Sequence, residues 1–189
     1  MFNYLIKVEY DGTNYVGWQN QKNGISIQEK IENALNKLLK SNIKITGAGR
    51  TDKGVHAFGQ HANFISESNI KNKNKFLSSI NFFLNNSLIS IIDLKKKKSS
   101  FHSRHNAKER IYEYQIINRQ GCLSIDKNRA WHVKKKLDID LLKKGAKTLV
   151  GTHDFSTFRS SSCSSKSPIK KVNSVKIKKI GDKIFIRFS

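Results

Sequence analysis

A glycine-rich segment between two strand-like stretches constrains the fold of this chain most. Residues 47–57 are GAGRTDKGVHA, with three glycines and no alternation of polar and apolar side chains. Residues 43–46 and 61–65, on either side, have the composition of strands. A strand–loop–strand unit can hold one side chain in place, because glycine lets the backbone turn tightly or approach a ligand closely. The carboxylate of this segment is Asp52, between Arg50 and Lys53.

Periodic patterns predict the rest of the architecture. A strand over residues 3–10 precedes a capping box, Ser26 to Glu29, and a helix whose apolar positions run from 27 to 39. The same patterns predict a helix over 76–84, strands over 88–94, 110–117 and 129–133, a helix over 140–150, and a hairpin over 170–188. We expect an α+β fold of two similar halves, each a mainly antiparallel sheet with packed helices. The lysine run 95–98 is expected to mark the boundary between domains 1–100 and 101–189. It is typical of a solvated loop, and a binding role is an equally good alternative.

The chain is strongly basic. Its 36 lysines and arginines oppose 14 aspartates and glutamates, which gives a net charge of +22. A charge of this size attracts polyanions, and nucleic acid is the leading partner because neutralised phosphates release counterions. Compositional drift in an AT-rich genome, which favours lysine codons, is the alternative explanation. Basic residues are spread over both halves and do not form a tail.

Cysteine content and hydropathy predict a cytoplasmic protein without membrane contact. Cys122 and Cys163, 41 residues apart, fit neither a disulfide framework nor a zinc ribbon. Cys163 lies in a polar run without a base motif, which gives no sign of a nucleophile. Glu9 and Asp11 interrupt any signal peptide, and no stretch approaches the roughly 18 apolar residues of a membrane span.

Residue types alone leave the role of Asp52 open. Arg50 and Lys53 favour the charged form of its carboxyl group, which could act as a nucleophile, a base or a metal ligand. A metal site is disfavoured because the segment has no second acid. A phosphate-binding loop is disfavoured because the GxxxxGK[ST] spacing is absent. The plainest alternative is a tight turn stabilised by an Arg–Asp ion pair.

Five segments of the chain are similar to motifs of one enzyme family. GRTDKGVHA closely resembles the GRTDxGVHA signature of the TruA family of tRNA pseudouridine synthases. The other segments follow in the family's order: EYDGTNYVGWQNQ at 9–21, SIQEKIENAL at 26–35, FHSRHNAKERIYEY at 101–114 and GTHDFSTFR at 151–159. The resemblance extends from residue 9 to about residue 175 and implies the pseudouridine synthase fold, with ferredoxin-like halves.

The resemblance also implies a reaction and a site. Uridine would be isomerised to pseudouridine in the anticodon stem-loop of tRNA, at tRNA positions 38, 39 and 40, without a cofactor or metal. Asp52 matches the family's catalytic aspartate, a nucleophile whose point of attack stays open here. Arg50 matches the arginine that pairs with it and helps hold the base out of the helix. Tyr112 matches the tyrosine that packs on the target uracil, although periodicity cannot separate it from Tyr114 or exclude a core role. The family implies a homodimer that binds tRNA, with DNA not expected.

Two smaller clusters have both a functional and a structural interpretation. Tyr10, Tyr15 and Trp18 could stack on bases, but an N-terminal aromatic cluster more often forms core. His102 and His105 have a spacing that could suggest a ligand pair, and without a third ligand we expect surface or structural residues.

The chain departs from the family pattern at two places. SINFFLNNSL, at residues 79–88, stands where the family has a stretch of the LNANLP type, which we expect to change a loop's shape. The family continues beyond the point matching Phe188 and Ser189, so we expect a fragment, a truncated gene product or a shortened form completed by dimerisation. The alternative to an enzyme is therefore a truncated, non-catalytic tRNA-binding protein. A basic ribosome-associated protein, which would bind any structured RNA, is a third hypothesis.

Overall fold

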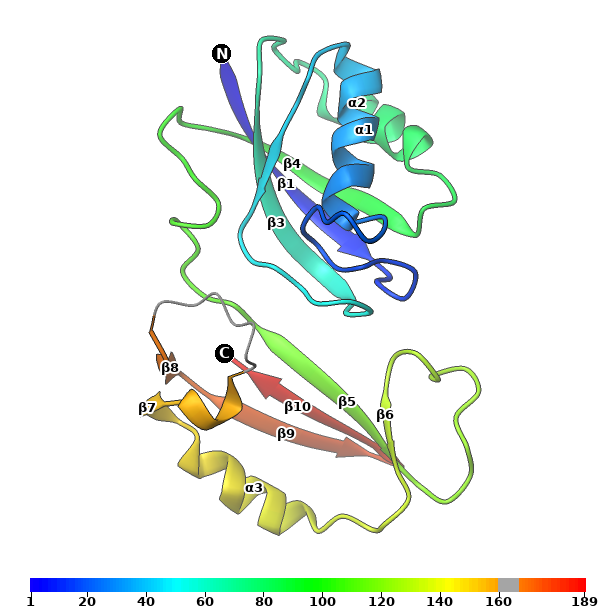
Figure 1. The fold of residues 1–189 in the computed structure, drawn as a ribbon, viewed down its shortest axis with the longest axis vertical. Coiled ribbons are helices and arrows are strands. Elements are labelled where there is room, and N and C mark those ends of the chain that lie inside the picture. Colours follow the sequence, from blue (N-terminus) through cyan, green and yellow to red (C-terminus); the bar gives the residue numbers. More distant parts are fainter. Residues whose placement is uncertain (160–166) are drawn as a thin grey trace. The chain divides into compact units, whose positions relative to one another are not determined.

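The computed structural model of the protein describes residues 1–159 and 167–189. The chain forms two compact units, Met1–Lys108 and Glu109–Ser189, and each contains its own four-stranded sheet (Figure 1). Cys163 lies outside the described residues. Among the described helices, none combines the length and apolarity that crossing a membrane requires.

The first unit is a sheet with two helices on one face. Its elements are β1 (Phe2–Tyr10), α1 (Ile27–Leu39), β2 (Ile45–Gly47), β3 (Ala57–Ser66), α2 (Lys73–Phe83) and β4 (Ile89–Lys97). The strand order is β2-β3-β1-β4, and all three pairings are antiparallel. This element sequence and strand order are those of a ferredoxin-like fold. The α+β prediction is confirmed.

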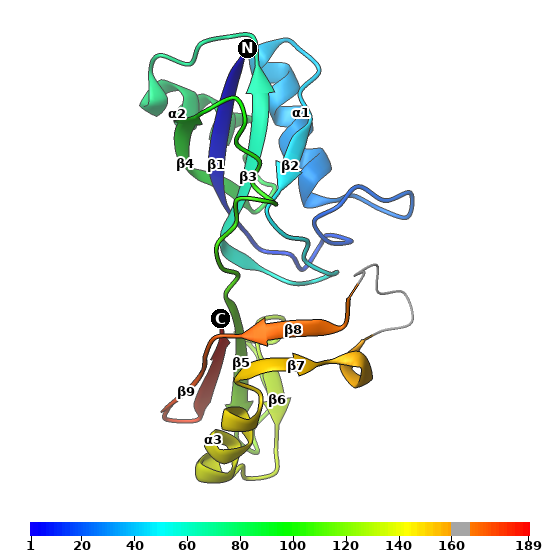
Figure 2. The ribbon, with the colours of Figure 1, turned by 90° about the vertical axis from the view of Figure 1, so that its left-hand side faces the viewer.

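The core of the first unit lies between the sheet and the two helices. Tyr4, Ile6 and Val8 alternate along β1 and are at most 1% exposed. Ile27 and Ile31 of α1 meet them in the same apolar cluster, which explains why α1 is amphipathic. The opposite face of the sheet carries neither α1 nor α2, and we call it the open face (Figure 2).

In its described residues, the second unit contains a mixed sheet, one α-helix and a separate two-stranded ribbon. Its elements are β5 (Tyr112–Asn118), β6 (Trp131–Val133), α3 (Ile139–Thr148), β7 (Gly151–Asp154), the short 3₁₀-helix η1 (Ser156–Phe158), β8 (Ile169–Val172), β9 (Val175–Ile180) and β10 (Lys183–Phe188). The sheet order is β6-β5-β10-β9, while β7 pairs with β8. The predicted hairpin is confirmed over residues 175–188, where β9 and β10 are antiparallel, with Ile180 opposite Lys183 across the turn. Its predicted first residues, 170–172, belong instead to β8, because they pair with β7.

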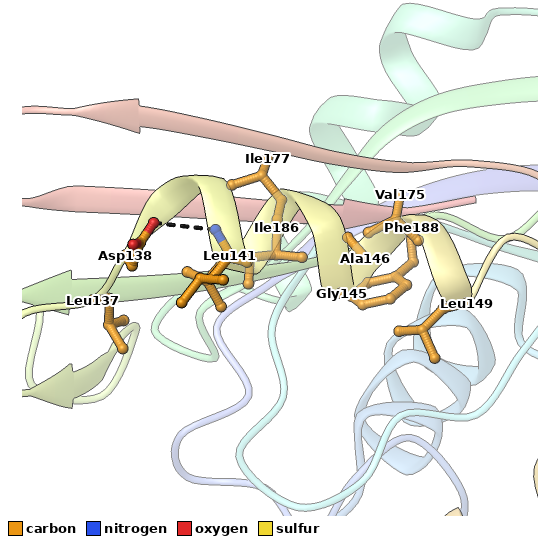
Figure 3. A pocket seen from close by; sticks show the side chains of 11 residues that line it. Leu137, Asp138, Leu141, Gly145, Ala146, Leu149, Val175, Ile177, Ile186 and Phe188 are labelled. Atoms are coloured by element: carbon orange, nitrogen blue, oxygen red, sulfur yellow. Dashed lines mark hydrogen bonds between the residues drawn. The ribbon is translucent and has the colours of Figure 1, made fainter.

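An apolar groove separates α3 from the strands beside it. None of the α3 residues, all of which the structure describes, is buried, and Leu141 is 66% exposed. The groove has a volume of about 470 Å³, and Leu149, Ile186 and Phe188 are among the apolar side chains that line it (Figure 3). The second unit therefore has a less closed core than the first.

The lysine run at residues 95–98 is not a solvated loop, and that expectation is wrong. Lys95, Lys96 and Lys97 are the last residues of β4, where they pair with Leu5, Tyr4 and Asn3. β4 is an edge strand, and charged side chains are common on edges because they prevent further strand pairing. The sequence predicts an end at residue 94 because the apolar residues stop there, whereas in the fold the strand continues as far as it pairs with β1.

Candidate active site

Residues 48–56, here called the Asp52 loop, connect β2 to β3. The strand pairing continues into the loop, because the amide of Ala48 donates to the carbonyl of His61 at 2.7 Å. The side-chain amide of Gln60 donates to the carbonyl of Gly49 at 3.0 Å. The first residues of the loop are therefore held against β3.

The segment after β1 supports the loop from a second direction. The amide of Trp18 donates to the carbonyl of Thr51 at 3.0 Å, and the hydroxyl oxygens of Tyr10 and Thr51 are 2.8 Å apart. Gly17 permits this approach: its φ is +118°, and a Cβ there would lie 2.7 Å from the Thr51 carbonyl oxygen. The segments EYDGTNYVGW and GRTDKGVHA are therefore joined directly by hydrogen bonds.

His56 joins the far end of the loop to the same segment. Its Nδ1 lies 3.1 Å from the amide nitrogen of Gly12 and 3.1 Å from a carboxylate oxygen of Asp11. A ring that is unprotonated at Nδ1 accepts from the amide, whereas a ring protonated there donates to the carboxylate. Asp11 also accepts from the amide of Thr13 at 3.0 Å. Either form of His56 therefore keeps the loop attached.

Asp52 itself is exposed, in a turn that its own backbone closes. The amide of Val55 donates to the carbonyl of Asp52 at 3.2 Å. Arg50 and Lys53 are exposed as well, and no ion pair joins either to Asp52 within the described residues. The loop is thus held by hydrogen bonds to β3 and to the segment after β1, and not by an Arg50–Asp52 ion pair. The carboxylate stays accessible to a ligand.

Glu32 of α1 is a buried carboxylate that the sequence pattern does not reveal. It is 3% exposed and accepts from the amide of Ile45 at 3.0 Å and from the side-chain amide of Gln28 at 2.9 Å. The ammonium of Lys44 lies 3.1 Å from its second oxygen. Ile45 begins β2, so Glu32 ties α1 to the strand that leads into the Asp52 loop. Polar residues of amphipathic helices normally face solvent, and nothing in the spacing sets Glu32 apart.

Tyr112 belongs to the second unit, whereas Arg50 and Asp52 belong to the first. It is the first residue of β5, lies opposite Phe188 and is 46% exposed. The register places Tyr112, Tyr114 and Phe188 on one face of the sheet. The ring of Tyr114 meets the ring of Phe188 edge-on, with centroids 5.8 Å apart. Tyr114 thus contacts Phe188 of its own sheet, while 62% of its surface stays exposed.

The N-terminal aromatic cluster is core. Tyr10, Tyr15 and Trp18 are 3%, 6% and 2% exposed, so stacking of these rings on bases is excluded. The ring centroids of Tyr10 and Trp18 lie 5.9 Å apart, and both residues hydrogen-bond to Thr51 of the Asp52 loop.

The rings of His102 and His105 contact each other, with centroids 4.3 Å apart. In the described part of the chain, no group of three or more His, Cys, Asp or Glu side chains could hold a metal ion.

Comparison with known proteins decides the family. A model of the tRNA pseudouridine synthase family matches residues 6–106 and 146–189. The chain belongs to the TruA family of tRNA pseudouridine synthases. The tRNA pseudouridine synthase A of Pelagibacter ubique is 53% identical over 188 residues, which are 100% of this chain and 76% of that protein. That of Parvibaculum lavamentivorans is 39% identical over 183 residues, 97% of this chain and 74% of the relative.

As a tRNA pseudouridine synthase, the protein is an isomerase that modifies tRNA. The Asp52 loop and both of its supports lie inside the first segment that the family model matches, while Tyr112 lies between the two segments. The two mainly antiparallel sheets with packed helices are consistent with the pseudouridine synthase fold. The TruA resemblance of the sequence is confirmed.

Proposed function

We propose that the protein converts uridine to pseudouridine at tRNA positions 38, 39 and 40, in the anticodon stem-loop, with Asp52 as the nucleophile. The observation that carries this proposal is an exposed carboxylate on a loop held by main-chain hydrogen bonds from both sides. In the reaction, the N1–C1′ bond of the nucleotide breaks and a C5–C1′ bond forms. C5 loses its proton and N1 gains one, so the product is an isomer and no cofactor is consumed.

Arg50 and Tyr112 would bind the target base. The uridine must leave the helical stack, which costs a few kcal/mol that protein contacts offset. The exposed guanidinium of Arg50, two residues from Asp52, can stack on a base and donate in a fork, which a lysine cannot do. Tyr112, half exposed at the start of β5, would pack on the uracil ring.

The charge of the chain fits a tRNA substrate. A net charge of +22 favours encounter with a polyanion, and the two relatives named above are tRNA pseudouridine synthases. We further propose that the active form is a homodimer with tRNA contacting both subunits. A non-catalytic tRNA-binding protein is the second candidate, favoured by the open groove beside α3, which leaves apolar side chains of the second unit uncovered.

Pseudouridine mapping on an unmodified tRNA transcript tests the proposal. Wild-type protein is compared with Asp52→Ala and with Lys53→Gln, which changes an exposed neighbour of the same loop. We expect new pseudouridine at tRNA positions 38–40 with wild type and Lys53→Gln, and none with Asp52→Ala. Product from Asp52→Ala would contradict the role of the carboxylate, and product at other positions would contradict the assigned sites. Tight tRNA binding by wild type without product would favour the binding protein.

A further inference from the structure

Four cationic or titratable side chains lie on the open face of the first sheet. Lys7 of β1 is directly opposite His61 of β3, and both face away from the helices. On β4, Lys95 is opposite Leu5 and Lys97 is opposite Asn3, so the alternation of β1 places both lysines on the same face. We call Lys7, His61, Lys95 and Lys97 the open-face cluster.

The side chain of Lys7 lies flat across β3. A Cβ at Gly59 would be 2.6 Å from Cε of Lys7, so the absence of a side chain at residue 59 makes room for the lysine stem. Burial lowers the pKa of His61, and the positive charges of Lys7, Lys95 and Lys97 lower it further, while Asp93 opposes them. The four groups are therefore close enough to act on one another electrostatically.

Asp93, the carboxylate that acts on His61, is already engaged by lysines. Asp93 of β4 bonds the ammonium of Lys73 at the start of α2, and Lys95 lies 3.6 Å from its other oxygen. Lys73 and Lys95 together outweigh the single charge of Asp93. Glu9, further along β1, is exposed. The open-face cluster therefore keeps an excess of positive charge.

Two buried asparagines fix the chain that borders the cluster. Asn3, 4% exposed, donates to the carbonyl of Phe101 at 2.7 Å and to that of Lys98 at 3.2 Å. Asn63, 7% exposed, donates to the side-chain oxygen of Asn3 at 3.1 Å and accepts from the amide of Ser103 at 2.9 Å. The segment after β4 is thus bound to the sheet, and Lys97, 5.2 Å from the ring centroid of Phe101, has a fixed neighbour.

We propose that the open-face cluster binds the phosphate backbone of tRNA, at nucleotides other than the target uridine. The inference rests on the proposed function for the identity of the RNA. Phosphate oxygens are contacted mainly by lysine, arginine and polar side chains, and such contacts position a nucleic acid without reading its sequence. The centres of protein–protein interfaces are instead depleted of lysine. The cluster therefore fits a polyphosphate strand better than an acidic protein.

Removing three charges from the open face, or three from the helical side of the first unit, tests whether the cluster binds phosphate. The triple variant Lys7→Gln, Lys95→Gln, Lys97→Gln is compared with Lys37→Gln, Lys71→Gln, Lys75→Gln, which removes the same charge from exposed lysines of α1, α2 and the segment before α2. Fluorescence anisotropy measures affinity for an unmodified tRNA transcript at several salt concentrations. For the open-face variant, we expect the slope of log K for tRNA binding against log salt concentration to become less steep by about three. We also expect its tRNA affinity at 0.1 M salt to fall at least about tenfold. Equal losses in both variants, or none in the first, would overturn the proposal.

A titration of the wild-type protein avoids any effect of the substitutions on folding. The pKa of His61 is measured by NMR in free protein, with saturating unmodified tRNA, and with poly-glutamate as an acidic polypeptide. Phosphates beside the cluster should raise the pKa of His61 with tRNA, because they cancel the charges that lower it, whereas poly-glutamate should leave it unchanged. An unchanged pKa with tRNA would overturn the proposal, and a rise with poly-glutamate alone would point to an acidic protein.

Two outcomes separate phosphate binding by the open-face cluster from catalysis by Asp52. If wild-type protein forms pseudouridine in full at saturating enzyme, but the open-face triple variant binds tRNA as tightly as wild type, only the phosphate-binding role of the cluster is contradicted. If the triple variant loses tRNA affinity but wild-type protein forms no pseudouridine, the proposed function is contradicted and the phosphate-binding role of the cluster is supported.

Discussion

The amide of Trp18 donates to the carbonyl of Thr51 at 3.0 Å, and this bond joins the segment after β1 to the residue immediately before Asp52. Trp18 is 2% exposed, so the bond starts from a residue that the core holds still. The position of Asp52 therefore depends on the segment after β1 as much as on its own loop.

Gly17→Ala should lower turnover as well as stability. Alanine at a φ of +118° would strain the backbone, and its Cβ would lie 2.7 Å from the carbonyl oxygen of Thr51. The strain alone should cost about 1–3 kcal/mol of unfolding free energy, measured by urea denaturation. Gly181→Ala is the matched control, because its φ is +60° with nothing within 4 Å of the added Cβ. It should cost stability but leave the turnover of folded enzyme unchanged, and equal turnover in both variants would contradict the account.

Glu32→Ala should destabilise the first unit. It removes the acceptor of the Ile45 amide and leaves that buried donor unsatisfied, at a cost of about 1–3 kcal/mol in the free energy of unfolding. Glu32→Gln keeps one carbonyl oxygen at this position and should cost less. Glu67→Gln, at an exposed position, should stay within about 0.5 kcal/mol of wild type. A loss for Glu32→Ala no larger than that for Glu67→Gln would show that the carboxylate does not hold β2.

Arg50→Lys should reduce turnover by more than it reduces tRNA affinity. The substitution keeps the charge but loses the planar fork, so a phosphate contact would survive and a base contact would not. We expect at least about a tenfold loss in kcat, measured beside Kd on the same tRNA. Parallel losses in kcat and affinity would argue that Arg50 binds phosphate and does not hold the base.

Stability should depend on pH through His61. The pKa of His61 in the folded protein lies below its ordinary value of 6.5, because of burial and then the nearby lysines. The unfolded chain therefore binds this proton more readily, so the contribution is complete above about pH 6.5 and is lost as the pH falls below it. The unfolding free energy of wild type should drop more between pH 7.5 and pH 5.5 than that of His61→Gln. The same drop in both proteins would contradict the assignment.

Local patterns explain why the first unit could be predicted. The capping residue Ser26 accepts from the amide of Glu29 at 3.0 Å, as the Ser-x-x-Glu spacing indicates, and the apolar period of α1 matches its buried face. The features that could not be predicted depend on partners distant in the chain. The end of β4 is set by pairing with β1, and the burial of Glu32 is set by β2. The alternation of residues 170–172 predicts that they extend the hairpin, but they belong to β8, because they pair with β7.

The candidate site also combines features that local sequence predicts with features that depend on distant residues. Motif resemblance located the Asp52 loop, but the two supports from Trp18 and His56 appear only in three dimensions. Neighbouring charges in the sequence suggested an Arg50–Asp52 ion pair, which the described residues do not form. Adjacency along a loop says little about contact, because side chains two residues apart point where the local backbone directs them.

The most direct test of the central claim is the single-turnover rate of pseudouridine formation by Asp52→Asn at saturating enzyme, with tRNA affinity measured in parallel. The amide keeps the shape of the side chain and removes the nucleophile and its charge. A rate reduced at least about a thousandfold, with affinity unchanged or slightly tighter, is the predicted result. A rate within about tenfold of wild type would show that the carboxylate on this loop does not carry the reaction.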